Sequence, residues 1–91
     1  MIFKPSKLKY SKYFLNDVYP RREYLTEELI LEALCNKIGE EKQDNDRISI
    51  FSYNVKHMKY LRVIVEYSEE NEMIIFNAYW DRTYLRKIQR G

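Results

Sequence analysis

The chain is poor in the residues on which several kinds of protein depend. Its 91 residues include one cysteine, Cys35, so an internal disulfide and a cysteine-based zinc site are both excluded. Cys35 lies within a helical pattern, and we expect a small buried residue rather than a nucleophile. Only two glycines and two prolines are present, which argues against a loop-rich scaffold.

Further absences narrow the chemistry. The single histidine, His57, cannot build a typical zinc site, and the chain has neither an HExxH motif nor a glycine-rich phosphate loop. Asp44 and Asp46 are expected to be solvated loop charges rather than a magnesium site. No apolar run reaches membrane-spanning length, and residues 1–3 are too short for a signal-peptide core. The sequence therefore predicts no metal, no cofactor and no membrane partner, in a reducing, cytoplasmic compartment.

What is present fits one domain over residues 1–91. A hydrophobic content of 45% is ordinary for a globular protein, and 91 residues leave no room for two cores. The net charge of +2 divides into +4 for residues 1–24, −4 for residues 25–55 and +2 for residues 56–91. Such separation can gather the basic ends on one face, which would suit phosphate groups. A mixed surface without a partner is the alternative.

The segment around which the chain is organised is a predicted β-hairpin. Residues 60–67 are rich in valine, isoleucine and tyrosine, which favour strands. Residues 68–72 form a polar break, and residues 73–80 are a second apolar run. Two such runs separated by a break of this length are typical of a hairpin with a longer loop.

Alternation along these strands predicts two unlike faces. One side of the second run is apolar and consists of Ile74, Phe76, Ala78 and Trp80. The opposite face carries polar residues, namely Arg62, Asn77, Tyr79 and Asp81. An arginine in mid-strand needs a partner, which would be either a nearby carboxylate or a polyanionic ligand.

Residues 25–38 are the most strongly predicted helix. Thr26 is a good N-cap, and Gly39 is placed to close the helix in a left-handed conformation. Ile30, Leu34 and Ile38 line its apolar stripe.

A shorter helix is predicted before it, starting at Ser6 or Ser11 and ending at Pro20. Its inner side would consist of Leu8, Phe14, Leu15 and Val18.

A charged loop at residues 40–46 and a strand at residues 47–55 follow the helices. Helices first and strands afterwards predict an α+β fold. We expect one or two N-terminal helices packed on one face of a curved, three- to four-stranded antiparallel sheet. The other sheet face would be open.

Metal-independent RNA cleavage is the reaction that this composition suits. The 2′-hydroxyl attacks the adjacent phosphate, which requires a base, an acid and cations around the phosphorane. The expected catalytic residues are His57, Arg62, Arg82 and Tyr84. The expected RNA-binding residues are Arg21, Arg22, Lys56, Lys59, Tyr79, Arg86 and Lys87.

These residues also have structural interpretations. Arg62 would be satisfied by an ion pair with Asp81 or Glu66. His57 could be a surface loop residue, and the tyrosines and remaining arginines could be packing or solvated groups.

Four strings resemble a known family of small bacterial proteins. They are PRREYLTEELILEAL at residues 20–34, DNDRISIF at 44–51, KYLRVIVEY at 59–67 and NAYWDRTY at 77–84. Over roughly residues 9–84 the chain resembles the RelE-like toxins of the barnase/EndoU/colicin/RelE superfamily of metal-independent ribonucleases. The resemblance implies an α+β fold, cleavage of mRNA or other RNA, in some cases on the ribosome, and a cognate antitoxin protein as partner.

The resemblance also carries over to single residues. The basic pair Arg21 and Arg22, the strand arginine Arg62 and the closing pair Asp81 and Arg82 match the family pattern. A non-catalytic RNA-binding module and a protein-interaction domain on the same fold are the alternatives.

One departure concerns the general base. Relatives often have histidine where this chain has Tyr13 or Tyr19, so His57 or a tyrosine would have to serve instead.

Overall fold

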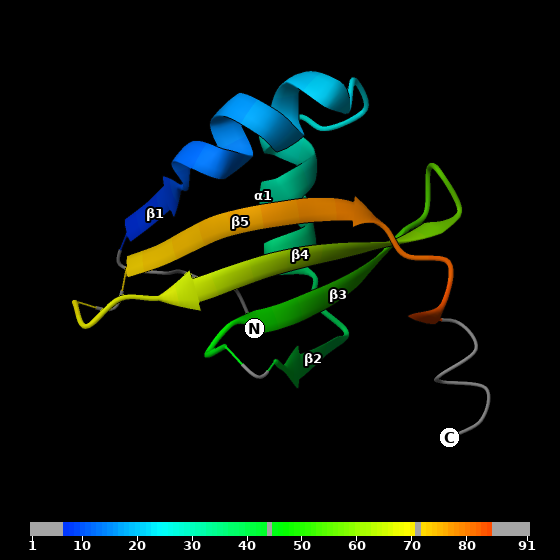
Figure 1. Cartoon of the computed structure of the whole chain (residues 1–91). Helices are drawn as coiled ribbons and strands as arrows, with labels where there is room; N and C mark the ends of the chain where they lie inside the picture. Colours follow the sequence, from blue (N-terminus) through cyan, green and yellow to red (C-terminus); the bar gives the residue numbers. More distant parts are fainter. Residues whose placement is uncertain (1–6, 44, 71, 85–91) are drawn as a thin grey trace.

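The computed structural model describes residues 7–43, 45–70 and 72–84, which form an α+β fold around one sheet (Figure 1). The strand order is β1-β5-β4-β3-β2. The long central strands are antiparallel: β3 (Ile48–Asn54), β4 (Lys59–Tyr67) and β5 (Glu72–Trp80). The α+β class predicted from the sequence is confirmed.

Two short strands flank this centre, so the prediction of three or four antiparallel strands is wrong. β2 (Gly39–Lys42) pairs antiparallel with β3, in the segment for which a charged loop was predicted. β1 (Lys7–Tyr10) pairs parallel with β5. The described sheet is therefore mixed and has five strands.

The predicted hairpin is confirmed, because β4 and β5 are antiparallel neighbours. Its register shifts in the middle, where Val65 lies opposite Ile75 although unbroken pairing would place Phe76 there. Phe76 is thus the extra residue of a β-bulge, and Ile75 is fully buried. The prediction that Ile74 and Phe76 share a side with Ala78 is wrong, because the extra residue reverses the alternation of side chains across the bulge.

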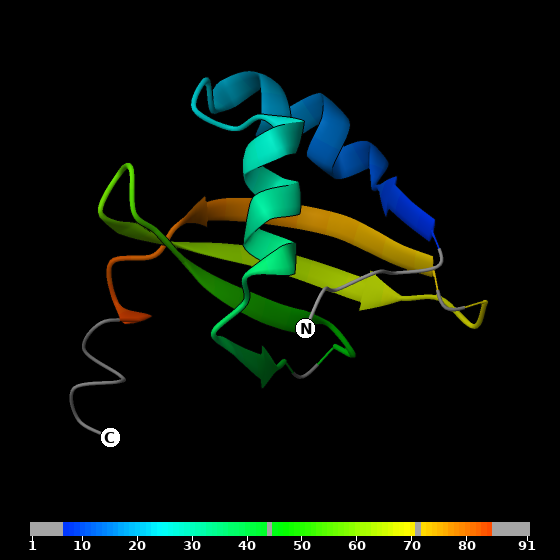
Figure 2. The same ribbon diagram turned by 180° about the vertical axis from the view of Figure 1, so that it is seen from behind.

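Helix α1 (Glu27–Cys35) crosses the sheet, as Figure 2 shows. The predicted N-cap is confirmed, since the Thr26 hydroxyl accepts a hydrogen bond from the Leu29 amide at 3.1 Å. Among the described residues, no helix has the length and apolar character needed to cross a membrane.

The end of α1 differs from the prediction. Asn36 is the C-cap, and its side-chain amide donates to the Glu32 carbonyl at 2.9 Å. Gly39 instead opens β2. Because the helix stops early, Ile38 is not part of its apolar stripe and is 54% exposed. Cys35, the last residue of the helix, is exposed rather than buried.

The segment before α1 is helical but irregular. A π-helix covers Phe14–Val18 (η1) and a 3-10 helix covers Tyr19–Arg21 (η2). The predicted Ser11 cap is present, since its hydroxyl accepts from the Phe14 amide at 3.0 Å. Pro20 does not end the helical segment, because it lies in the first turn of η2, where its missing N–H has no helical partner to lose.

Two apolar residues of this segment were placed wrongly from the sequence. Leu8 belongs to β1 rather than to the short helix, and Leu15 is 50% exposed rather than inward-facing.

The core joins the helical segments to one face of the sheet. Its buried residues form a single cluster of Phe14, Val18, Leu25, Leu29, Ile30, Ala33, Leu34, Ile50, Leu61, Val63, Val65, Met73, Ile75 and Ala78. No described helix lies over the opposite face, which Figure 1 turns toward the viewer. Phe51, Arg62 and Tyr79 lie on that side, whereas Trp80 packs against the core on the helix side.

The capping bond of α1 gives a first prediction. Thr26→Ala removes the acceptor of the Leu29 amide, so we expect the free energy of unfolding to fall by about 1 kcal/mol. Urea unfolding followed by circular dichroism measures the change. Thr26→Ser keeps the hydroxyl and should retain most of the stability, whereas equal losses in both variants would contradict the capping role.

Candidate functional site

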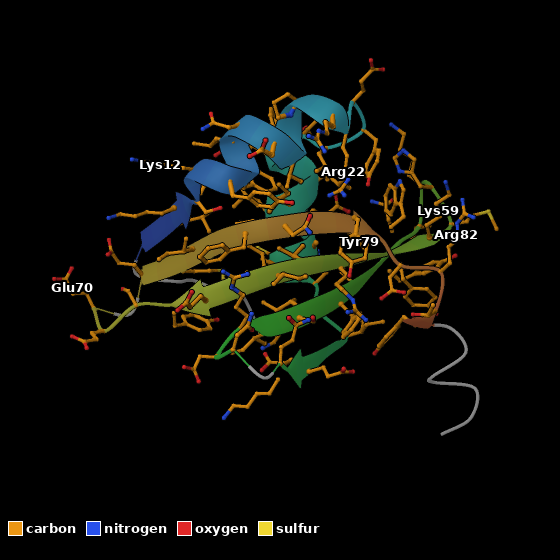
Figure 3. The ribbon with its side chains drawn as sticks, viewed as in Figure 1. Lys12, Arg22, Lys59, Glu70, Tyr79 and Arg82 are labelled. Carbon is orange, nitrogen blue, oxygen red and sulfur yellow. The ribbon has the colours of Figure 1, made fainter. Side chains whose placement is uncertain are left out.

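A hollow of about 420 Å³ lies where β4 begins and β5 ends. We call it the end pocket, and it is lined by Tyr53, Met58, Lys59, Tyr60, Trp80, Asp81 and Arg82. Figure 3 shows Lys59 and Arg82 together at this end of the sheet. The end pocket thus combines two cations with three aromatic rings.

The register of the sheet brings these residues together. Tyr53 and Tyr60 are cross-strand partners in β3 and β4, and their ring centroids lie 4.9 Å apart in an edge-on arrangement. Trp80 is the last residue of β5, and the Lys59 ammonium lies 5.7 Å from its ring centroid. Because Lys59 and Arg82 are next to Tyr60 and Trp80 at the same strand ends, a bound group could meet charge and aromatic surface at once.

The β3–β4 turn places His57 beside this pocket. Its ring centroid lies 5.2 Å from that of Trp80. The Asn54 side-chain oxygen accepts from the His57 backbone amide at 2.9 Å and also lies 2.9 Å from Nδ1. Because the Asn54 oxygen can only accept, a hydrogen bond from Nδ1 to it requires the His57 tautomer that carries a proton on Nδ1. In neutral His57 the other nitrogen, Nε2, is then the one able to accept a proton.

The Arg62 side chain forms an ion pair with Asp81 and is therefore not free to bind a phosphate. Its Nε lies 2.7 Å from Asp81 Oδ2, and the two side chains are only 13% and 4% exposed. The Nε–H group does not point along this contact, so charge rather than a well-formed hydrogen bond holds the pair. The ion pair that the sequence offered as the structural alternative is thus the arrangement observed.

Aromatic rings cover the same arginine. The guanidinium carbon of Arg62 lies 4.7 Å from the Phe51 ring centroid. Tyr84 stacks on Phe51 with centroids 4.1 Å apart and planes 15° apart. Gly39 leaves room for this ring, because a Cβ there would come within 2.6 Å of the Tyr84 hydroxyl. Tyr84 therefore acts as a packing residue on the open face of the sheet.

Asp81 also organises the turn that follows β5. Its Oδ1 accepts from the Thr83 amide and the Thr83 hydroxyl, both at 2.7 Å, and from the Tyr84 amide at 3.1 Å. Burial by itself would raise the pKa of the Asp81 carboxyl. The hydrogen bonds from Thr83, the charge of Arg62 and the Tyr84 amide outweigh burial, so the pKa lies below its ordinary value.

Other predicted RNA-binding residues do not line the end pocket, although Tyr79 lines an adjoining hollow with Arg62 and Arg82. One Arg22 nitrogen donates to the Asn77 side-chain oxygen at 2.6 Å and to the Ala78 carbonyl at 2.9 Å, so it ties the connector before α1 to β5. The Tyr79 ring lies 5.7 Å from the Arg22 guanidinium carbon (Figure 3). Arg21 is exposed and Lys56 is exposed in the β3–β4 turn. Neither lines the end pocket.

Arg86 and Lys87, also predicted to bind RNA, lie outside the described residues. Within the described residues, no group of three or more histidine, cysteine, aspartate or glutamate side chains is arranged to hold a metal ion.

The sequence reasoning missed several residues of the site. They are Asn54, Tyr53, Met58, Tyr60 and Trp80. The sequence does contain one signal for them. If residues 54 and 59 are paired across the predicted turn, Tyr53 lies opposite Tyr60.

The ion pair gives a second prediction. Asp81→Asn keeps an oxygen for the Thr83 bonds but leaves the Arg62 charge without its partner, so we expect a loss of about 3 kcal/mol at neutral pH. The lowered pKa means that ionised Asp81 stabilises the fold above about pH 4 and that this stabilisation disappears as the pH falls through the folded-state pKa.

The gap in stability between wild type and Asp81→Asn should therefore narrow at low pH, which urea titrations between pH 7 and pH 2 would measure. The control is Asp46→Asn, at an exposed position with φ of 63° that asparagine also tolerates. A gap that stays constant with pH would contradict a role for the Asp81 charge.

Comparison with known proteins does not test the resemblance to RelE-like toxins. No family model, no curated protein and no solved structure matches this chain. The case for a function therefore depends on the geometry of the end pocket and on the residues around it.

Proposed function

We propose that the protein is a metal-independent endoribonuclease that binds single-stranded RNA in the end pocket. The observation that carries the proposal is the meeting of Lys59, Arg82 and Trp80 in one hollow beside a histidine whose Nδ1 is hydrogen-bonded to Asn54. Cations suit the phosphate, and aromatic rings suit an unpaired base.

The proposed reaction is attack by the ribose 2′-hydroxyl on its own 3′-phosphate. His57 Nε2 takes the proton of that hydroxyl, and the 2′-oxygen forms a bond to phosphorus. The bond from phosphorus to the 5′-oxygen of the next nucleotide breaks, and that oxygen takes a proton from solvent. The products are a 2′,3′-cyclic phosphate and a 5′-hydroxyl.

The cations have different tasks in this proposal. Arg82 is exposed and lines the end pocket, so it is the guanidinium that contacts the phosphate, together with Lys59. Arg62 acts indirectly, because its ion pair with Asp81 holds the turn from which Arg82 projects.

Non-catalytic RNA binding is the second candidate. The observation in its favour is the pairing of Arg62 with Asp81, which removes one cation from the group that a phosphorane would need. Action on the ribosome and a cognate antitoxin belong to the first candidate and stay predictions from the resemblance, and a cytoplasmic location stays a prediction from the composition.

Cleavage gives the third prediction. End-labelled single-stranded RNA, incubated with the protein in EDTA and resolved on a gel, should yield fragments with 2′,3′-cyclic phosphate ends. His57→Ala should slow cleavage by roughly 10²–10⁴-fold, the usual contribution of a general base, while RNA affinity stays the same. RNA that is bound but never cut, with and without ribosomes, would support the second candidate instead.

Binding gives the fourth prediction, measured by fluorescence anisotropy of labelled RNA at several salt concentrations. Lys59→Gln and Arg82→Gln should each weaken binding and reduce the slope of log affinity against log salt by about 0.7. The matched controls are Lys56→Gln and Arg21→Gln, which change exposed cations outside the end pocket. Equal losses of affinity in all four variants would mean that RNA binds through the overall positive charge of the surface rather than through this pocket.

A further inference from the structure

A second hollow lies away from the end pocket and has no role in the proposed cleavage. It encloses about 150 Å³ and is lined by Tyr10, Phe14, Leu15, Tyr19, Glu27 and Ile30. β1, which supplies Tyr10, pairs with the beginning of β5, whereas the end pocket lies at the other end of that strand. We call this hollow the aromatic cleft.

Three rings form much of the cleft. Tyr10 and Phe14 stack with centroids 5.4 Å apart and planes 20° apart. Tyr19 is tilted by 46° from Phe14 at a centroid distance of 5.9 Å. Tyr19 is 41% exposed and Tyr10 is half-buried, so these two rings offer surface to a ligand, whereas Phe14 and Ile30 are buried.

Among the described residues, Glu27 is the single charged one that lines the cleft. Its carboxylate is exposed, on the first turn of α1. Burial first, and then the negative charge of Glu27, raise the pKa of the Tyr10 hydroxyl. The field of the carboxylate thus reaches the rings, and no cation of the described part of the chain lines the cleft to offset it.

Aromatic faces and a carboxylate around one small space attract the same class of ligand. Ring faces carry negative electrostatic potential, and a cation seated over them gains energy beyond apolar burial. Glu27 would repel an anion, and a neutral apolar group would gain no electrostatic attraction from its carboxylate. We propose that the aromatic cleft binds the alkylammonium group of a small organic cation.

Choline is the probe for the test, and 3,3-dimethylbutan-1-ol is its neutral counterpart of the same shape. In NMR titrations of the full chain, choline should shift the amide resonances of Tyr10, Tyr19 and Ile30 in a saturable way. The alcohol should bind at least about fivefold more weakly, because it lacks the charge. Equal binding of both compounds, no saturable shift, or shifts confined to Trp80 would overturn the proposal.

Variants with matched controls separate the two attractions. Glu27→Gln should weaken choline binding by about fivefold, whereas Glu28→Gln, an exposed residue on the same turn but outside the cleft, should not. Tyr19→Leu should likewise weaken binding, whereas Tyr13→Leu should not, since Tyr13 is 56% exposed and does not line the cleft. Equal effects within either pair would overturn the proposal.

Two further measurements define what is recognised. Tyr10→Phe keeps the ring and removes a buried hydroxyl that has no hydrogen-bond partner, so binding should persist. If this variant does not bind choline, the proposal that the ring face of Tyr10 attracts the cation is overturned. N-acetyl-trimethyllysine amide is the last probe. If it binds more tightly than choline, the ammonium group that the cleft recognises belongs to a peptide. If it binds equally or more weakly, the ligand is a free small cation.

Discussion

The contact between Arg62 and Asp81 determines how the open face of the sheet is arranged. One oxygen of Asp81 meets the Arg62 charge, and the other accepts three hydrogen bonds from the turn that follows. That turn lays Tyr84 on Phe51 and leaves Arg82 at the rim of the end pocket. A buried ion pair contributes little to the free energy of unfolding by itself, but removing either partner leaves an unpaired buried charge, which is strongly destabilising. Its main effect is to fix one geometry for the chain after β5.

Local signals in the sequence were sufficient for the parts of the fold that depend on neighbours along the chain. The Thr26 cap and the β4–β5 hairpin follow from residues a few positions apart, and both are present. The edge strands and the bulge at Phe76 were not predictable in this way. β1 and β2 are each four residues long, and partners elsewhere in the sheet decide whether such short segments become strands. Tertiary packing likewise decides where the alternation of β5 is interrupted.

The same distinction applies to the candidate site. The sequence indicated His57, Lys59 and Arg82 because their residue types suit phosphate chemistry, and the structure places all three at one end of the sheet. It could not decide between a ligand and a carboxylate for Arg62, since that choice depends on how the chain turns after Trp80. Tyr53 and Tyr60 went unnoticed, because their importance arises from cross-strand pairing rather than from a motif.

The parallel pairing of β1 with β5 has a consequence for folding. Lys7 lies opposite Glu72, so this contact joins residues that are 65 positions apart in the sequence. Contacts so distant along the chain are entropically costly to form early, and they slow the search for the native topology. During synthesis from the amino terminus, β1 is made long before β5, its neighbour among the described strands. The first strand of the described chain is thus among the last to find its place, and completion of the sheet must wait for the arrival of β5.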